Sequence, residues 1–587
     1  MKRAYKIYKY FISAILIVMI PACDDFLEKS PLNNLTDKTF FKTEADIKQF
    51  TDGLYGGFTP GTNNIFFDYC TDLVGHNLSK AGNRQYSQLI FGTQTSTSGT
   101  IGLYFDYAPI RNAYIILEKI DEVPLSTASK NLHLGTIQYL LAYRYFMMFR
   151  AYEAVPIVRE VLEVENSDIP SSPKEEVFQE ALSFINQAIE NLPSLGPNAR
   201  ERGRLTKLVA LTLKADMLLY TSFRYGEALP GAKYSDAANA ALAAIKEADA
   251  CSYGLADDYE KLFIAEYQAE NDAQKEIIFE YVRLKDIATD MFCVYHFGPR
   301  KNDIGWADFT VSQEAIDMYE CTDGKLINKS SLYDPLHPFK NRDPRFELTT
   351  LYPGRPCSFL DGDTWISNTL DPSEGNPDYM LSTYNPLDTP PTGYINIKYW
   401  DRLKKGSTGY ASFIAYRYAE LLLMYAEALN EASGPSKEVY DALTKLRNRA
   451  SIKMPAITSQ THPTKAELRD LIRRERVVEL YGEGKRYWDV RRWGVGEIVQ
   501  NKSFYSMHIS KFNPDGSFAG YQDKIYARTS LTDPTKEELF EIPDGAIGGR
   551  LLHTGIFNDA KYYVWPIPQT AINNSFSGAL KQHPLWQ

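Results

Sequence analysis

Apolar side chains return at every third or fourth position through two long parts of this chain, which places them on one face of an α-helix. One such stripe consists of Ile110, Ala113, Tyr114, Leu117 and Ile120, and the next of Ile137, Leu141, Tyr145 and Met148. Because each helix must bury its apolar face against another element, the stripes predict a mostly α fold built from packed helices.

The helices are predicted to come in pairs. Residues 205–223 and 235–250 form two helical stretches joined by GEALPGAKYS, and the second is so rich in Ala that a neighbouring helix can approach it closely. Residues 411–450 contain another pair, which Gly434-Pro435 separates. No constant 34-residue period is present, so the pattern alone indicates degenerate repeats.

Helix starts can be read from capping residues. The first helix is expected to begin near Thr43. Ser172-Pro173-Lys174-Glu175 predicts a helix with Ser172 as N-cap and Pro173 in the first turn. Thr464 and Glu467 have the spacing of a capping box and open the helix LRDLIRRERVVELYGEG.

The region from about 251 to 410 has a different composition, rich in Gly, Pro, Asn, Asp and aromatic residues, as in YDPLHPFKNRDPRF. Such a composition is typical of turns and loops. Residues 496–587 are also loop-like, apart from a short apolar run at 562–565. The expected layout is a helical scaffold at about 41–250 and 411–495, a loop-rich face between them and a loop-rich tail.

The N-terminus resembles a secretion signal. Lys2, Arg3, Lys6 and Lys9 precede an apolar run at 11–20 that is too short to span a bilayer as a helix. The run ends in Ile20-Pro21-Ala22-Cys23, which resembles a bacterial lipobox. We therefore expect residues 1–22 to be a signal peptide, Cys23 to be lipidated, and residues 23–40 to be a tether.

Charge and composition exclude some classes of function. The net charge of −10 repels polyanions, so a nucleic-acid partner is not expected. The other cysteines, Cys70, Cys251, Cys293, Cys321 and Cys357, show no C-x-x-C spacing, which argues against a structural zinc site or a disulfide framework. The eight His residues form no i, i+4 pair, and no nucleophile elbow, Walker loop or complete dinucleotide fingerprint is present. No catalytic residue, metal or cofactor is predicted.

The densest charged cluster, 473–493, contains Glu475 and Glu479 one helical turn apart. They lie on an apolar helix face, so at least one should be partly buried and paired with a cation such as Arg447, Arg486 or Arg491. A retaining glycosidase pair is the catalytic alternative, but such a pair needs an open cleft. The residue pattern favours structural ion pairs.

Two groups of side chains in the loops have the chemistry of a sugar site, in which flat rings stack on a pyranose and planar polar groups bind its hydroxyls. The first group is Tyr295, Asn302, Asp303 and Trp306, and the second is Asp72, Asn83, Arg84 and Tyr86. The alternative for each ring is that it only covers the core.

Several segments together resemble the SusD/RagB family of outer-membrane nutrient-binding lipoproteins. They are CDDFLEKSP (23–31), NRDPRF (341–346), RYAELLLMYAEALNEASG (417–434), LTKLRNRA (443–450), IRRERVVELYGEGKRYWDVRRW (472–493) and YYVWPIPQTAINN (562–574). The resemblance implies a single domain of degenerate tetratricopeptide-like helix pairs, with long loops as the ligand face and a few short strands. It also implies a non-enzymatic protein, with Asp24-Asp25 directing the lipoprotein to the outer leaflet.

The resulting hypothesis is a lipid-anchored outer-membrane protein that captures glycan and passes it to a TonB-dependent SusC-like transporter. Ligand residues differ between family members, so none of the eight nominated residues is carried over from the family. The alternative is an α-solenoid adaptor that binds protein partners, or another nutrient, with no sugar site.

Overall fold

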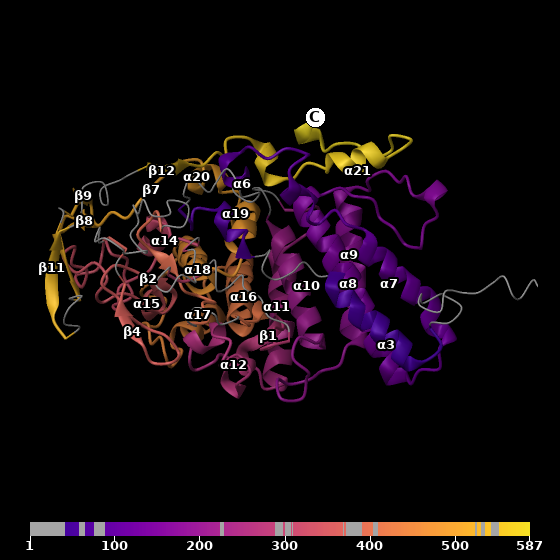
Figure 1. The fold of residues 1–587 in the computed structure, drawn as a ribbon, viewed down its shortest axis with the longest axis horizontal. Helices are drawn as coiled ribbons and strands as arrows, with labels where there is room; N and C mark the ends of the chain where they lie inside the picture. The colour runs from indigo at the N-terminus through magenta and orange to yellow at the C-terminus, as the bar shows by residue number, and fades with distance from the viewer. Residues whose placement is uncertain are drawn as a thin grey trace, which may run out of the picture.

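The computed structural model describes residues 41–57, 65–75, 88–223, 228–287, 297–299, 307, 309–367, 369–370, 390–402, 409–522, 525–529, 535–541 and 551–587. Most of the described chain is helical or irregular, as predicted (Figure 1). The longer helices, labelled as in Figure 1, are α3 (Glu44–Gly53), α7 (Ala108–Lys119), α8 (Thr127–Tyr152), α9 (Lys174–Asn191), α10 (Lys207–Ser222), α11 (Tyr234–Ala250), α16 (Tyr418–Ser433), α17 (Lys437–Arg447), α18 (Lys465–Leu480) and α19 (Arg486–Trp493).

Helices that follow one another along the chain pack side by side. α8 packs on α9, α10 on α11, and α16 on α17 (Figure 1). α11 also packs on α16, although some 170 residues of chain separate them, and α16 packs on α18. The predicted pairs at 205–223 with 235–250 and within 411–450 are thereby confirmed, and together the helices form one continuous row.

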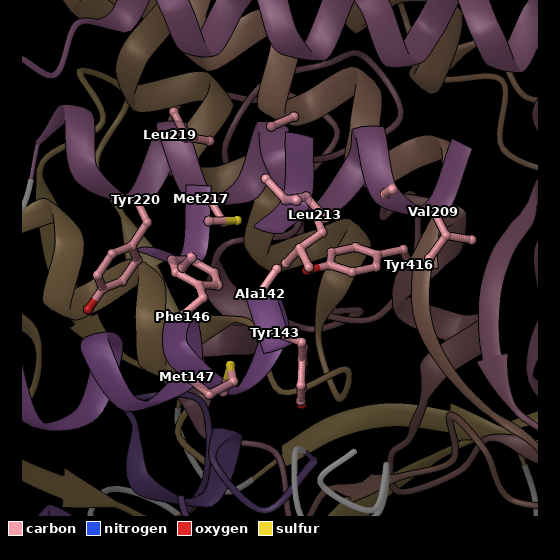
Figure 2. Close-up of a cluster of buried hydrophobic side chains, with 14 of the residues drawn as sticks. Ala142, Tyr143, Phe146, Met147, Val209, Leu213, Met217, Leu219, Tyr220 and Tyr416 are labelled. Carbon is pink, nitrogen blue, oxygen red and sulfur yellow. The ribbon is translucent and has the colours of Figure 1, made fainter. Parts of the chain in front are cut away.

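Helix α8 lies at the centre of the helical core. It has 26 residues, and nearly every side chain from His133 to Tyr152 is buried. A helix that is apolar on all sides belongs inside a protein. Figure 2 shows Phe146 and Met147 of α8 beside Met217 and Tyr220 of α10, with Tyr416 at the edge of the same cluster.

The Ala-rich helix α11 lies between two neighbours. It packs against both α10 and α16. Its buried side chains are Ala237, Ala238, Ala240, Ala241, Ala244 and Ala248. Methyl side chains allow a neighbouring helix to approach closely, as the sequence predicted, and here helices approach α11 from two sides.

Two predicted helix starts are confirmed, and a third is wrong by one residue. Thr43 caps α3, and Thr464 forms a complete capping box with Glu467 at α18. At α9 the N-cap is Pro173, which has no side-chain capping bond. Ser172 lies one residue before the cap, and its N–H donates to the Val155 carbonyl at 2.9 Å.

The rest of the described chain contains short helices and two-stranded antiparallel ribbons, several of which surround a second hydrophobic core. The short helices are α6 (Gln88–Phe91), α12 (Asn271–Glu276), α14 (Gln313–Asp317), α15 (Pro344–Thr349), α20 (Gly496–Val499) and α21 (Gln569–Asn574). The ribbons pair β1 (Ile277–Tyr281) with β6 (Phe413–Arg417), β2 (Thr350–Leu351) with β5 (Ile395–Asn396), β3 (Pro356–Ser358) with β4 (Thr364–Ile366), β7 (Ser503–Tyr505) with β12 (Leu551–Thr554), β8 (Ser510–Phe512) with β9 (Phe518–Tyr521), and β10 (Ile525–Thr529) with β11 (Glu537–Glu541).

A buried ion network joins the two parts. Its members come from the α12, α14, α15, β5, β6, α17 and α18 regions and are almost completely enclosed. They are Glu276, Glu320, Asp343, Arg345, Lys398, Arg417, Arg447, Arg449, Glu475, Glu479 and Glu483. Removing one member leaves a charge buried without its partner, which typically costs about 3–5 kcal/mol. The network therefore fixes the loop-rich part to the helical scaffold.

Candidate ligand-binding site

The two segments that carry most of the nominated sugar-binding residues each have one end at the same β-bridge. Val74 and Val311 form an antiparallel bridge. Beside it, the Gly75 N–H donates to the Thr310 carbonyl at 3.2 Å, and the Ser312 N–H donates to the Leu73 carbonyl at 2.9 Å. Residues 76–87 follow this bridge directly, and residues 300–306 precede it.

A third segment meets the other two at this point. The Asn396 N–H donates to the Phe309 carbonyl at 2.9 Å, and the Gly298 N–H donates to the Asn396 carbonyl at 3.2 Å. A Cβ atom on Gly75 would lie only 2.1 Å from Cγ2 of Thr392, so a glycine is needed there. We call residues 72–75, 309–312 and 390–396 the loop junction.

Buried aromatic rings pack against the residues of the loop junction. Tyr69 and Phe309 pack edge to face with their centroids 4.4 Å apart, and Phe297 lies 5.2 Å from Phe309. A Cβ atom on Gly298 would lie 2.6 Å from the Trp400 indole, so the backbone of this segment rests directly on that ring. These rings belong to the core, and they hold the ends of the loops in fixed positions.

Most of the nominated residues lie outside the described residues. This applies to Tyr295, which precedes residues 297–299, to Asn302, Asp303 and Trp306 in the segment 300–306, to Asn83, Arg84 and Tyr86 in the segment 76–87, and to Cys23. The described chain nevertheless brings the ends of their two segments together at the loop junction.

Asp72 is the one nominated residue that is described, and it is 1% exposed. Both of its carboxylate oxygens accept hydrogen bonds from Arg486, at 2.9 Å from Nε and 2.8 Å from Nη2. Its neighbour Asp68 accepts bonds from the backbone N–H groups of Gly484 and Arg486, and burial raises the pKa of Asp68 to about 7. The structure therefore gives Asp72 a scaffold contact in place of the predicted ligand contact.

The Glu475 and Glu479 carboxylates are enclosed. They are 2% and 1% exposed, and both accept hydrogen bonds from Nη1 of Arg345, at 3.0 and 2.9 Å. Burial alone would raise the pKa of Glu475, but Arg345 and Arg447 outweigh it and lower that pKa to about 2. Burial likewise opposes ionisation of Glu479, yet Arg417, Arg449 and Arg345 bring its pKa well below the usual range.

This geometry does not fit a glycosidase pair. A general acid in that mechanism needs a raised pKa and a cleft that admits the substrate. Here both carboxyl groups have lowered pKa values and face arginine side chains inside the protein. The predicted structural ion pairs are the arrangement that the structure has.

The cations differ in part from those expected. Arg447 binds Glu475, as predicted. Arg486 binds Asp72 instead, and Arg491 donates to the Tyr562 carbonyl at 3.1 Å. The sequence reasoning missed Arg345, which lies in the NRDPRF segment, because nothing local connects residue 345 with 475.

The described part of the chain offers no metal centre: no group of three or more His, Cys, Asp or Glu side chains there is arranged to hold a metal ion. Cys70, Cys251, Cys321 and Cys357 are thiols in the structure. Among the described residues, no helix combines the length and apolar character needed to cross a bilayer.

Comparison with known proteins assigns the family. A SusD family model matches residues 275–586. The chain belongs to the SusD family. A second SusD-like model, described as starch-binding associating with outer membrane, matches residues 25–215. The family resemblance carried by the sequence motifs is confirmed.

Relatives of this SusD-family chain cover most of its length. A SusD-like protein of Formosa agariphila is 25% identical over 516 residues, which are 84% of this chain and 92% of the relative. The solved structure of a SusD-like carbohydrate-binding protein from Bacteroides fragilis has a TM-score of 0.72 and 23% identity, covering 91% of this chain and 99% of its own.

A laminarin-binding SusD-like protein has a TM-score of 0.60 and 19% identity, covering 92% of this chain and 99% of its own. At this identity the two structures establish the fold. The predicted SusD-like scaffold of helix pairs with long loops is therefore confirmed.

Proposed function

We propose that this chain is a surface lipoprotein that binds glycan without cleaving it and passes it to a TonB-dependent SusC-like transporter in the outer membrane. The observation that carries the proposal is the loop junction. It brings together one end of each of the two segments that contain Trp306, Tyr86 and most of the nominated planar polar residues. A sugar site needs both kinds of side chain within the width of one ligand.

The names of similar proteins support the choice of ligand. One matching family model is described as starch-binding associating with outer membrane. Two structures of the same fold are named carbohydrate-binding and laminarin-binding. A protein-only adaptor has no comparable support.

The proposed chemistry is stacking and hydrogen bonding. Trp306, Tyr295 and Tyr86 would offer ring faces to the apolar side of a pyranose. Asn302, Asp303, Asn83 and Arg84 would bind its hydroxyl groups. Lipidation at Cys23 would confine the protein to the membrane that holds the transporter, and this confinement raises the effective concentration of a weakly held ligand.

Isothermal titration of the purified chain against soluble starch oligosaccharides, laminarin oligosaccharides and xylo-oligosaccharides tests the proposal. We expect one of these glycans to bind, and Trp306→Ala to weaken that binding at least about tenfold, or roughly 1.4 kcal/mol. Trp586→Ala is the matched control, since Trp586 is a half-buried tryptophan near the C-terminus.

Three outcomes are informative. Binding that survives Trp306→Ala unchanged would remove Trp306 from the site. Absence of binding to every glycan, together with a stable complex between the chain and an outer-membrane transporter, would favour the protein adaptor. Release of shortened glycan during the titration would contradict a purely binding role.

A further inference from the structure

A cavity of about 310 Å³ lies at helix α15, and none of its lining residues belongs to the loop junction. It is formed by residues 337–347 and 352–356, with Ala527 and Glu537 contributed by β10 and β11. This volume lies within the range of about 300–1,000 Å³ that is typical of small-ligand sites.

Three aromatic rings form the apolar part of this cavity. Phe346 and Tyr352 are stacked with centroids 5.1 Å apart and an angle of 12° between their planes. Phe339 lies 4.4 Å from Tyr352 at 30°. Phe346 is buried, whereas Phe339 and Tyr352 are half-buried. The three rings thus form a nearly parallel cluster that is partly open to solvent.

Among the described residues, no Leu, Ile, Val or Met side chain lines the cavity. A second cavity, of about 410 Å³, differs in this respect because it is lined by Val158, Leu162, Ile169 and Leu580. Aliphatic linings suit acyl chains or apolar peptide side chains. Flat rings with a polar rim instead suit a ligand that has one apolar face and many hydroxyl groups.

Arg342, beside the rings, is enclosed by the protein. It is 7% exposed, and its Nη atoms donate to the carbonyls of Pro338, Ile316 and Tyr319. Its Nε is also buried and has no hydrogen-bond partner among the described residues. Arg342 therefore forms part of the cavity wall and is not a ligand contact.

Two groups beside the rings can bind hydroxyls. The Tyr352 hydroxyl makes no hydrogen bond within the described chain, and burial raises the pKa of this group so that it stays neutral. The Glu347 side chain is 59% exposed, and Arg355 is its cation within the described chain, with Nε 3.9 Å away. Together these two residues supply a donor and acceptors beside the rings.

Two pairs of polar side chains at the rim contact each other. Lys340 Nζ lies 2.6 Å from Glu537, and His337 Nδ1 lies 2.7 Å from Asp334. Because the exposed Glu347 carboxylate would repel an anion and accept hydrogen bonds from hydroxyl groups, an uncharged polyol fits the cavity better than an anion.

We propose that the α15 cavity is a second carbohydrate site, which takes a neutral pyranose ring. The ring stacks on Tyr352, and its hydroxyl groups bind the Tyr352 hydroxyl and the Glu347 carboxylate. This inference rests on the proposed glycan-binding function and extends it to a ligand long enough, or numerous enough, to occupy two places on one protein.

The test measures binding in two backgrounds, the unaltered chain and Trp306→Ala. The probes are maltoheptaose, laminarihexaose and xylohexaose, with an oligogalacturonate as the charged comparison. Tyr352→Phe removes one hydroxyl and keeps the ring, and Glu347→Gln removes one charge. Glu190→Gln is the matched control, since Glu190 is an exposed glutamate on α9.

We expect a neutral oligosaccharide that still binds the Trp306→Ala chain. Tyr352→Phe and Glu347→Gln should each weaken this remaining binding about five- to tenfold, whereas Glu190→Gln should leave it unchanged. Crystals soaked in the same oligosaccharide should show a sugar ring on Tyr352.

Other results would overturn the inference. If Trp306→Ala abolishes all binding while Tyr352→Phe and Glu347→Gln have no effect in the unaltered chain, the second site does not exist and the proposed function stands. If only the oligogalacturonate responds to Tyr352→Phe, the neutral class is wrong. If no probe binds the unaltered chain, the proposed function fails and this inference fails with it.

Discussion

Glu479 illustrates how buried charges are stabilised in this protein. Its carboxylate accepts hydrogen bonds from Arg345 at 2.9 Å, from Arg417 at 2.6 Å and from Arg449 at 3.0 Å. Isolated buried ions are expensive, and they are tolerated only when partners satisfy most of their hydrogen-bonding capacity. In this network each carboxylate shares guanidinium groups with its neighbours, so the residues stabilise the fold as a group.

Glu475 should make the stability of the protein depend on pH at the acid end. Its folded-state pKa of about 2 lies below the ordinary 4.5, so the unfolded chain binds its proton more readily. By linkage, the stabilisation is fully present above about pH 4.5 and is lost as the pH falls towards 2. We expect the urea midpoint to fall over that range.

The neutral variant Glu475→Gln provides the comparison. It should be less stable at pH 7, because Arg345 and Arg447 lose a buried partner, but its midpoint should change less between pH 5 and about pH 2.5. Equal slopes for the two proteins would show that Glu475 does not carry the expected linkage.

At the scale of elements, the loop junction depends on one small residue. The Cβ of Gly75→Ala would lie 2.1 Å from the Thr392 methyl and 3.0 Å from Leu552 Cδ1. We expect this variant to displace the two segments and to weaken glycan binding at least about tenfold. Titration against the glycan that the unaltered chain binds measures the effect.

A second substitution makes this test specific. Thr392→Ser removes the clashing methyl group but keeps the hydroxyl, which is bonded to the Tyr394 backbone. The double variant should therefore recover most of the lost binding. Gly53→Ala is the control, because a Cβ there would meet no atom within 4 Å. Failure of Thr392→Ser to rescue would mean that the clash is not the cause.

The elements that could be predicted are those specified by residues close together in the sequence. The helix pair at α10 and α11 and the Thr464 capping box depend on residues a few positions apart, so the sequence alone could locate them. The start of α9 lies one residue later than the capping pattern indicated, with Pro173 in the N-cap position. Asp72 and Arg486 are 414 residues apart, and no local pattern could assign them to each other.

The candidate site was predictable to a lesser degree. Composition located the loops, and the described chain brings the ends of two of them together. The α15 cavity was not predicted. It depends on the stacking of Tyr352 on Phe346 and on Glu537, which the β10–β11 hairpin contributes from a distant part of the sequence. Such contacts are set by tertiary packing and leave no periodic trace in the sequence.

At the scale of the whole molecule, the close packing of the row of helices depends on the small side chains of α11. Ala244 is completely buried on a helix that packs against both α10 and α16. Ala244→Leu should force these helices apart and lower the free energy of unfolding by about 1–3 kcal/mol. Chemical denaturation measures the change.

Ala243→Leu is the matched control, since Ala243 is exposed on the same helix. It should change the free energy of unfolding by less than about 0.5 kcal/mol. If both variants unfolded at the same denaturant concentration as the unaltered chain, close packing around α11 would not limit the stability of the scaffold.

The loop junction is held largely by main-chain hydrogen bonds between Gly75 and Thr310, Leu73 and Ser312, Phe309 and Asn396, and Gly298 and Asn396. Bonds of this kind form whatever side chains the intervening stretches carry. Substitutions in those stretches can therefore change ligand specificity during evolution while the scaffold that holds their ends stays the same.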